Sequence, residues 1–150
     1  MISINNKNKF GFSLLEVLLV LALFGIISTF SIPAYISFQN RNDLDLSVQK
    51  TVSTLRRAQT LAKNQEGDSD WSIRTTGNTL VLYKGNNFAG RTVSFDESFE
   101  FPSTIQYSLT QDIIWQKFLG TPTSTATLTL SNGQNEQKVI SINEKGAISY

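Results

Sequence analysis

The stretch Gly11-Phe12-Ser13-Leu14-Leu15-Glu16, with the apolar run that continues from it to Ile32, decides the fold of this chain. Between Phe12 and Ile32, Glu16 is the only residue with a formal charge. A helix over this run rises about 30 Å, which is roughly the thickness of the hydrocarbon core of a bilayer. The run therefore predicts one membrane-spanning helix, and Pro33 closes it.

Glu16 is the anomaly in this run, because a carboxylate inside a membrane helix costs about 3 kcal/mol unless it is paired, protonated or held at the interface. In one interpretation, lipid headgroups partly solvate Glu16 one turn inside the membrane. In the other, a cation offsets the cost. Cleavage between Gly11 and Phe12 would create an α-amino group four residues before Glu16, on the same helical face. Such an amine is positively charged near neutral pH.

Two other kinds of N-terminal segment compete with this interpretation. An ordinary secretory signal peptide has an apolar core of about 7 to 15 residues, followed by a small-x-small cleavage site. Here the run is longer, and the small residues from Ser28 to Ser31 are interrupted by Phe30 and followed by Ile32-Pro33, which suits cleavage poorly. A plain N-terminal anchor shares the length and the charges of this segment, and Glu16 is the residue that argues against it.

The segment Lys9-Phe10-Gly11-Phe12-Ser13-Leu14-Leu15-Glu16 resembles the class III signal sequence of type IV prepilins and type II secretion pseudopilins. This resemblance implies that a prepilin peptidase cuts after Gly11 and methylates the new amine of Phe12. It also implies that Glu16 serves filament assembly by pairing with the Phe12 amine of a neighbouring subunit. Ser13 and Leu15 stand where Thr and Ile are commoner in that family.

A second helical pattern follows Pro33. Apolar residues recur at spacings of three and four through about residue 64 and form one stripe, while most charges lie off it. The two patterns predict one long helix from about Phe12 to Gln65, loosened near Gly25 and bent at Pro33. The resemblance supports Gly25 and Pro33 as the positions of the loosening and the kink. The stripe consists of Leu44, Val48, Val52, Leu55, Ala58 and Ala62.

The composition limits the chemistry available to the chain. Its 150 residues leave room for one domain beyond the membrane helix, and the formal net charge is +1. The sequence contains neither Cys nor His, which excludes disulfides, Ser-His-Asp and Cys-His catalytic groups, and metal sites with nitrogen or sulfur ligands. We therefore expect no enzyme, no cofactor and no metal site.

Two local charge patterns have a functional and a structural interpretation. The alternating carboxylates Glu66, Asp68 and Asp70 could gather Ca²⁺, but the spacing does not continue as an EF-hand loop, so a solvated turn that ends the helix is preferred. Arg56-Arg57 could contact DNA, but two adjacent arginines are ordinary on a solvated helix face with acidic residues nearby. Nucleic acid is therefore not an expected partner.

From Trp71 onward the apolar pattern changes to a period of two, which predicts about seven to nine short antiparallel strands. Residues 112–118 fit either a strand that carries Trp115 or a loop that buries it. Aromatic side chains in this half are expected in the core rather than in a ligand groove. They are Trp71, Tyr83, Phe95, Phe99, Phe101, Tyr107, Trp115 and Tyr150. The other expected strands span residues 71–75, 79–84, 91–95, 99–101, 105–109, 125–130, 138–142 and 147–150.

The predicted fold is α+β, with a long N-terminal helix packed on a C-terminal antiparallel β domain. The helix has a membrane half and an amphipathic half. Segments of the second half resemble the GspH/FimT group of minor pilins and pseudopilins, among them Leu55-Arg56-Arg57-Ala58-Gln59, Trp71-Ser72-Ile73, Leu82-Tyr83-Lys84-Gly85 and Ile142-Asn143-Glu144-Lys145-Gly146. The expected parts are a leader at 1–11, a membrane or filament-core helix at 12–33, an amphipathic helix at 34–65 and the β domain at 66–150.

The resemblance implies a structural subunit, and a minor one, of a type IV pilus or a type II secretion pseudopilus. Its implied partners are a prepilin peptidase, other pilin or pseudopilin subunits, the inner-membrane assembly machinery and, before assembly, the lipid bilayer. Lys7 and Lys9 favour a cytoplasmic leader, so the chain is expected to cross the inner membrane once with its β domain outside. The alternative is a membrane-anchored extracytoplasmic binding domain, including a DNA-uptake pilin. The sequence does not distinguish a pilus from a pseudopilus. It also does not decide whether the filament serves adhesion, motility, DNA uptake or protein export.

Overall fold

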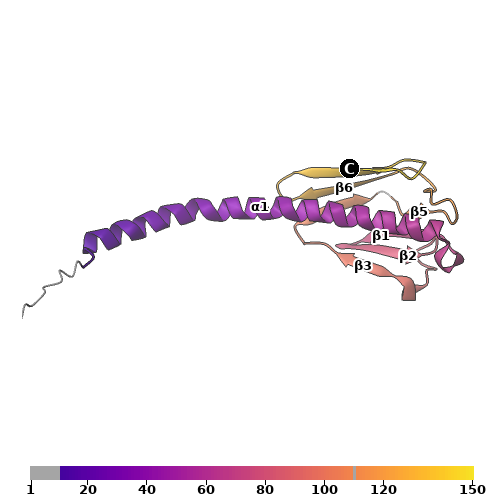
Figure 1. Cartoon of the computed structure of the whole chain (residues 1–150), viewed down its shortest axis with the longest axis horizontal. Coiled ribbons are helices and arrows are strands. Elements are labelled where there is room, and N and C mark those ends of the chain that lie inside the picture. Colours follow the sequence, from indigo (N-terminus) through magenta and orange to yellow (C-terminus); the bar gives the residue numbers. More distant parts are fainter. Residues whose placement is uncertain (1–10, 110) are drawn as a thin grey trace, which may run out of the picture. The chain divides into compact units, whose positions relative to one another are not determined.

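The computed structural model describes residues 11–109 and 111–150, with the side chain of residue 30 left out (Figure 1). Contacts divide the chain into two units, with the boundary between Ser37 and Phe38. Helix α1 runs from Leu14 to Lys63 and so contributes to both units. The expected helix from Phe12 to Gln65 is thus confirmed to within two residues at each end. Most of the expected leader, residues 1–10, lies outside the described residues.

In the first unit, α1 is exposed on all sides, with every residue from 14 to 29 and from 31 to 36 open to the surroundings. Three of its hydroxyl groups are satisfied within the helix. Ser28, Thr29 and Ser31 each donate a hydrogen bond of 2.8–3.0 Å to the backbone carbonyl one turn earlier. A hydroxyl paired in this way can lie in an apolar environment without the cost of an unpaired donor. Of the described residues, α1 is the one helix long and apolar enough to cross a membrane.

In the second unit, one face of α1 is buried against the β domain. The predicted stripe is confirmed, because all six of its residues are buried. Three further residues of this face, Ser47, Thr51 and Thr54, are buried although they are polar. Each donates its hydroxyl to a backbone carbonyl one turn earlier, at 2.7–2.9 Å, and this internal pairing lets it enter the core.

The β domain consists of two antiparallel sheets of four strands each. The first, sheet A, has the order β3-β2-β1-β5, and the second, sheet B, has the order β4-β6-β7-β8. Two short 3₁₀ helices, η1 (Glu66–Asp68) and η2 (Val93–Phe95), lie in the connections. The strands are β1 (Trp71–Thr76), β2 (Thr79–Lys84), β3 (Glu97–Glu100), β4 (Ile105–Leu109), β5 (Ile113–Trp115), β6 (Ala126–Asn132), β7 (Gln137–Ile142) and β8 (Ile148–Ser149).

Most expected strands are confirmed, but the one at residues 91–95 is wrong. Residues 92–95 are all exposed, so this segment has no face to bury, and its last three residues form η2. Arg91 holds the segment as a loop by pairing with Asp96 at 2.7 Å and by donating to the carbonyl of Phe88 at 2.8 Å. The next strand, expected at 99–101, begins earlier, at Glu97. Trp115 lies in a strand and is fully buried, which decides between the two alternatives for residues 112–118.

The second-unit part of α1 shares one hydrophobic core with both sheets and lies alongside them (Figure 1). Polar contacts attach both sides of this part of the helix to the sheets. On one flank, Arg57 pairs with Glu97 of β3 at 2.5 Å, and the ammonium group of Lys50 lies 4.1 Å from the centre of the Phe99 ring. On the other flank the helix pairs with β7 and the turn before it. The helix is therefore held to an edge strand of sheet A and to sheet B at once.

The aromatic side chains mostly follow the prediction. Trp71, Tyr83, Phe101 and Trp115 are buried, and Phe99 and Tyr107 pack against the core. The prediction is wrong for Phe95 and Tyr150, which are 43% and 67% exposed. Phe95 belongs to η2 and Tyr150 follows the last strand, so neither lies on the inner face of a sheet.

Tyr83 gives the domain a predicted sensitivity to alkaline pH. Burial, together with the hydrogen bond that its hydroxyl donates to Asp112 at 3.0 Å, raises the pKa of Tyr83 to about 12. The folded state therefore keeps this proton after the unfolded state has lost it. We expect the contribution of Tyr83 to the free energy of unfolding to fall by about 2 kcal/mol as the pH rises from 10 to 12. Urea unfolding of Tyr83→Phe should show a smaller loss over this range, and an equal loss would contradict the assignment.

Candidate functional site

The N-terminal motif leads directly into α1. Gly11, Phe12 and Ser13 are exposed and precede the helix, which begins at Leu14. Ser13 caps the helix, because its hydroxyl oxygen accepts a hydrogen bond from the backbone N–H of Leu15 at 3.3 Å. Its carbonyl accepts the N–H of Val17 at 3.2 Å and starts the helical hydrogen-bond pattern. The predicted cleavage site thus lies in exposed backbone just outside the helix.

Glu16 lies in the first turn of α1. A carboxylate is favourable there, because the free N–H groups at a helix N-terminus carry partial positive charge. Ser13 and Glu16 also have the Ser-x-x-Glu spacing of a capping box, a signal that the sequence analysis missed. None of the ion pairs among the described residues includes Glu16.

Gly25 and Pro33, the predicted positions of loosening and kinking, both lie inside α1. A Cβ added at Gly25 would meet no described atom within 4 Å, so contacts within this chain do not require glycine there. Pro33 supplies no N–H to the carbonyl of Thr29, yet the helix continues through it to Lys63. The kink at Pro33 and the loosening at Gly25 stay predictions.

Two of the three carboxylates in the turn after α1, those of Asp68 and Asp70, have separate partners. Asp68 pairs with the ammonium group of Lys117 at 2.7 Å, which lowers the pKa of the Asp68 carboxyl. Asp70 accepts the backbone N–H of Lys117 at 2.8 Å. Among the described residues, no group of three potential ligands is placed to hold a metal ion. This turn fixes the end of α1 to the loop after β5, a tertiary role that local sequence does not reveal.

Arg57 serves the fold. Its guanidinium binds both carboxylate oxygens of Glu97, with distances of 3.0 and 2.8 Å from Nε and 2.5 Å from the terminal nitrogen. The hydrogen bonds and the charge of Glu97 raise the pKa of Arg57. A guanidinium engaged in this two-point contact has less capacity left for a phosphate. The geometry therefore gives no support to Arg57 as a DNA contact, while Arg56 is exposed.

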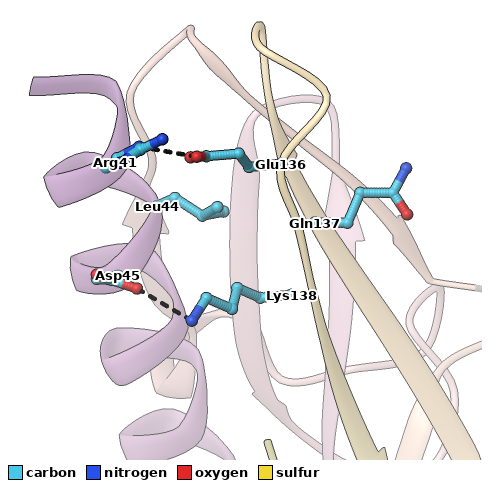
Figure 2. Close-up of a pocket in the computed structure, with 6 residues that line it drawn as sticks. All are labelled: Arg41, Leu44, Asp45, Glu136, Gln137 and Lys138. Atoms are coloured by element: carbon cyan, nitrogen blue, oxygen red, sulfur yellow. Dashed lines mark ion pairs between the residues drawn. The ribbon is translucent and has the colours of Figure 1, made fainter. Parts of the chain in front are cut away.

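A cavity of about 470 Å³ lies between α1 and β7, and Figure 2 shows its lining. Arg41 of the helix pairs with Glu136 at 2.8 Å, and Asp45 pairs in the opposite sense with Lys138 at 3.6 Å. Leu44 lies between the two pairs (Figure 2). Since each charged side chain of the lining has a partner of opposite charge, the cavity offers no uncompensated charge for a ligand. The two ion pairs that line the cavity join α1 to β7 and to the turn before β7.

The comparisons with known proteins agree with this geometry. A family model described as the prokaryotic N-terminal methylation motif matches residues 6–32. No curated protein sequence matches the chain. The fold is similar to that of the minor pseudopilin EpsH from the type 2 secretion system of Vibrio cholerae, with a TM-score of 0.56 and 14% identity. That similarity covers 71% of this chain and 94% of EpsH.

The described residues thus define a protein with one exposed apolar N-terminal helix joined to an antiparallel β domain. The chain thus combines an N-terminal methylation motif with a fold similar to that of a pseudopilin.

Proposed function

We propose that this chain is a structural subunit, and a minor one, of a type IV pilus or type II secretion pseudopilus. The observation that carries the proposal is the first-unit helix, which is exposed on all sides, apolar, and charged only at Glu16. A helix that is apolar all round has to be covered by lipid or by other helices. Membrane insertion followed by filament assembly supplies both covers in turn. The similarity to a minor pseudopilin supports the minor role.

The proposed sequence of events begins in the inner membrane, with the leader in the cytoplasm and the β domain outside. Prepilin peptidase cuts between Gly11 and Phe12 and methylates Phe12, and the assembly machinery then moves the helix from lipid into a bundle of like helices. Lipid tails and helix surfaces are both apolar, so little hydrophobic free energy is lost in the move. The amine of Phe12 then meets Glu16 of a neighbouring subunit and sets the register.

The proposed division of the chain into segments follows from this order of events. Residues 1–11 are the leader, 12–33 the helix that passes from membrane to filament core, 34–65 the amphipathic helix and 66–150 the β domain. The boundary between the two contact units, at Ser37 and Phe38, lies close to the proposed end of the membrane helix.

Replacing Gly11 by leucine is expected to leave the precursor uncut, because the peptidase has to admit the backbone at this residue. Mass spectrometry of the N-terminal peptide is the measurement. The natural chain should begin at a methylated Phe12 and the variant at Met1. Gly25→Leu is the matched control, since it makes the same change inside the helix and should be processed normally. A natural chain that still begins at Met1 would overturn the proposed function and favour a plain anchored binding domain.

A further inference from the structure

The loop that follows β5, residues 116–121, presents two neighbouring apolar side chains. Phe118 is 61% exposed and Leu119 is 64% exposed. We call residues 116–121 the apolar loop. Its backbone is fixed: the N–H of Phe118 donates to the carbonyl of Ala62 at 3.1 Å, and the N–H of Gly120 donates to the carbonyl of Gln116 at 2.9 Å. The loop is thus held against the end of α1 with its apolar side chains outward.

The backbone of the apolar loop is also strained. Phe118 has a φ of 69°, in the left-handed region that a bulky side chain rarely adopts. Strain of this kind persists where the surrounding structure enforces it, and it clusters at sites that bind. Exposure and strain at one aromatic residue both cost the isolated domain free energy. A partner that covers this side chain would compensate for both.

A cavity at the other edge of sheet A is suited to receive these side chains. It measures about 420 Å³ and is lined by three apolar residues, Leu61, Trp71 and Phe95, and by five polar or charged ones, Arg57, Glu66, Ser94, Asp96 and Glu97. We call it the Phe95 cavity. The rings of Trp71 and Phe95 meet edge to face, with centroids 6.4 Å apart. Val93, which is 65% exposed, lies on the same 3₁₀ helix as Phe95. The volume lies within the range of pockets that bind small molecules, so it can admit an aromatic ring.

The apolar loop and the Phe95 cavity lie at the same end of sheet A but at opposite edges. The strand order β3-β2-β1-β5 places β5, which precedes the loop, at one edge and β3, which begins at the cavity, at the other. The registers pair Trp71 with both Lys84 and Trp115, so these three residues mark one end of the sheet. The loop follows Trp115 directly, and Trp71 lines the cavity.

We propose that the apolar loop of one copy docks in the Phe95 cavity of a second copy. Because the apolar loop and the Phe95 cavity lie at opposite edges of sheet A, two copies that stand side by side in the same orientation can bring them together by a lateral shift. Such a contact is heterologous, and copies of a minor subunit can make it in the membrane before assembly. The charges also match. Among the charged residues that line the cavity, Arg57 and Glu97 pair with each other and Asp96 pairs with Arg91, whereas no ion pair between described residues includes Glu66. Lys63 lies against Gly120 of the apolar loop and supplies the opposite charge.

Two side chains bury too little area for a stable complex in dilute solution. The contact therefore rests on the proposed function, because a shared membrane or filament confines the copies and raises their effective concentration. An anionic lipid surface is a poorer partner for the loop. Its own cation, Lys117, is already paired with Asp68.

Cysteine cross-linking of the full chain in membranes tests this contact, because the natural sequence has no Cys and each new thiol is unique. Leu119→Cys and Ser94→Cys, expressed together as two separate chains, should form a mixed disulfide dimer on oxidation. Each variant alone should give little dimer, and one chain carrying both changes should give a ladder of oligomers. Val139→Cys, on sheet B and 50% exposed, is the matched control for Leu119→Cys.

Several outcomes would overturn the second-copy contact. The contact is refuted if no mixed dimer forms, or if the Val139→Cys control gives an equal yield. It is also refuted if Leu119→Cys forms dimers without Ser94→Cys, or if the chain cross-links only to a different protein. The N-terminal mass is measured on the same samples. A mature N-terminus without the cross-link would remove the contact alone, whereas a cross-link in an uncut chain would remove the proposed function alone.

A second variant separates docking from folding. Phe118→Gly removes the side chain and suits the left-handed backbone, so it should raise the Tm of the β domain. In the Leu119→Cys chain it should also abolish most of the mixed disulfide. A Tm that rises with the cross-link unchanged would show that Phe118 does not contribute to docking.

Discussion

Replacing Glu16 by alanine is expected to leave the chain inserted and processed but nearly absent from filaments. In the proposed filament, the Glu16 carboxylate meets the Phe12 amine of a neighbour inside an apolar bundle. Removing one partner of a buried ion pair leaves the other uncompensated, which costs about 3 to 5 kcal/mol. A loss of this size corresponds to a factor of about 100 or more in the equilibrium for adding a subunit.

The measurement compares the amount of this chain in purified filaments with the amount in membranes. Glu16→Gln should fail as Glu16→Ala does, because it keeps the size of the side chain but not its charge. Glu100→Ala, which removes an exposed carboxylate from β3, is the control and should assemble normally. Normal incorporation of Glu16→Ala would refute the pairing role, while an uncut Glu16→Ala chain would place the residue in processing instead.

Replacing Gly146 by alanine is expected to destabilise the β domain by about 2 to 5 kcal/mol, from backbone strain and overpacking together. Gly146 has a φ of 80°. A Cβ there would lie 2.6 Å from Nε2 of Gln59, 3.0 Å from the carbonyl oxygen of Gly120 and 3.0 Å from the Trp115 ring. The Gly120 carbonyl is backbone and the ring is fully buried, so neither can move aside easily.

Gly146 matters because three parts of the domain meet there. The side-chain amide of Gln59, on α1, donates to the carbonyls of Gly120 and Gly146 at 2.9 and 3.1 Å. The helix, the apolar loop and the turn between β7 and β8 are thus joined by one side chain. A Cβ at Gly146 would displace this amide and loosen all three.

Urea unfolding of the full chain in detergent, followed by circular dichroism, measures the effect of Gly146→Ala. Gly133→Ala is the matched control, because a Cβ at Gly133 would meet no atom within 4 Å. We expect Gly133→Ala to change the free energy of unfolding by less than about 1 kcal/mol. Equal effects of the two substitutions would contradict this account of Gly146.

Local sequence patterns predicted the helix and strands of this fold well where the spacing of apolar residues fitted only one kind of secondary structure. The stripe from Leu44 to Ala62 is buried as its spacing requires, and β2 and β4 have the expected bounds. The failure at 91–95 has a tertiary cause, since Arg91 is held by Asp96 and the segment covers no core. In the candidate site, the spacing of Ser13 and Glu16 contained a helix-capping signal that was readable but missed.

The sequence by itself determined the long helix, its apolar first half, the charged motif at its start and the period-two pattern of the strands. These features depend on residues a few positions apart, whose side chains share a face through the fixed geometry of helix or strand. Tertiary structure alone decided that Trp71 pairs with Trp115, that Asp70 holds Lys117, and that the apolar loop and the Phe95 cavity occupy opposite edges of one sheet. Such pairings join segments that lie tens of residues apart in the sequence. Forming them costs loop-closure entropy, and the apolar surface buried when the whole core forms determines which pairings are stable.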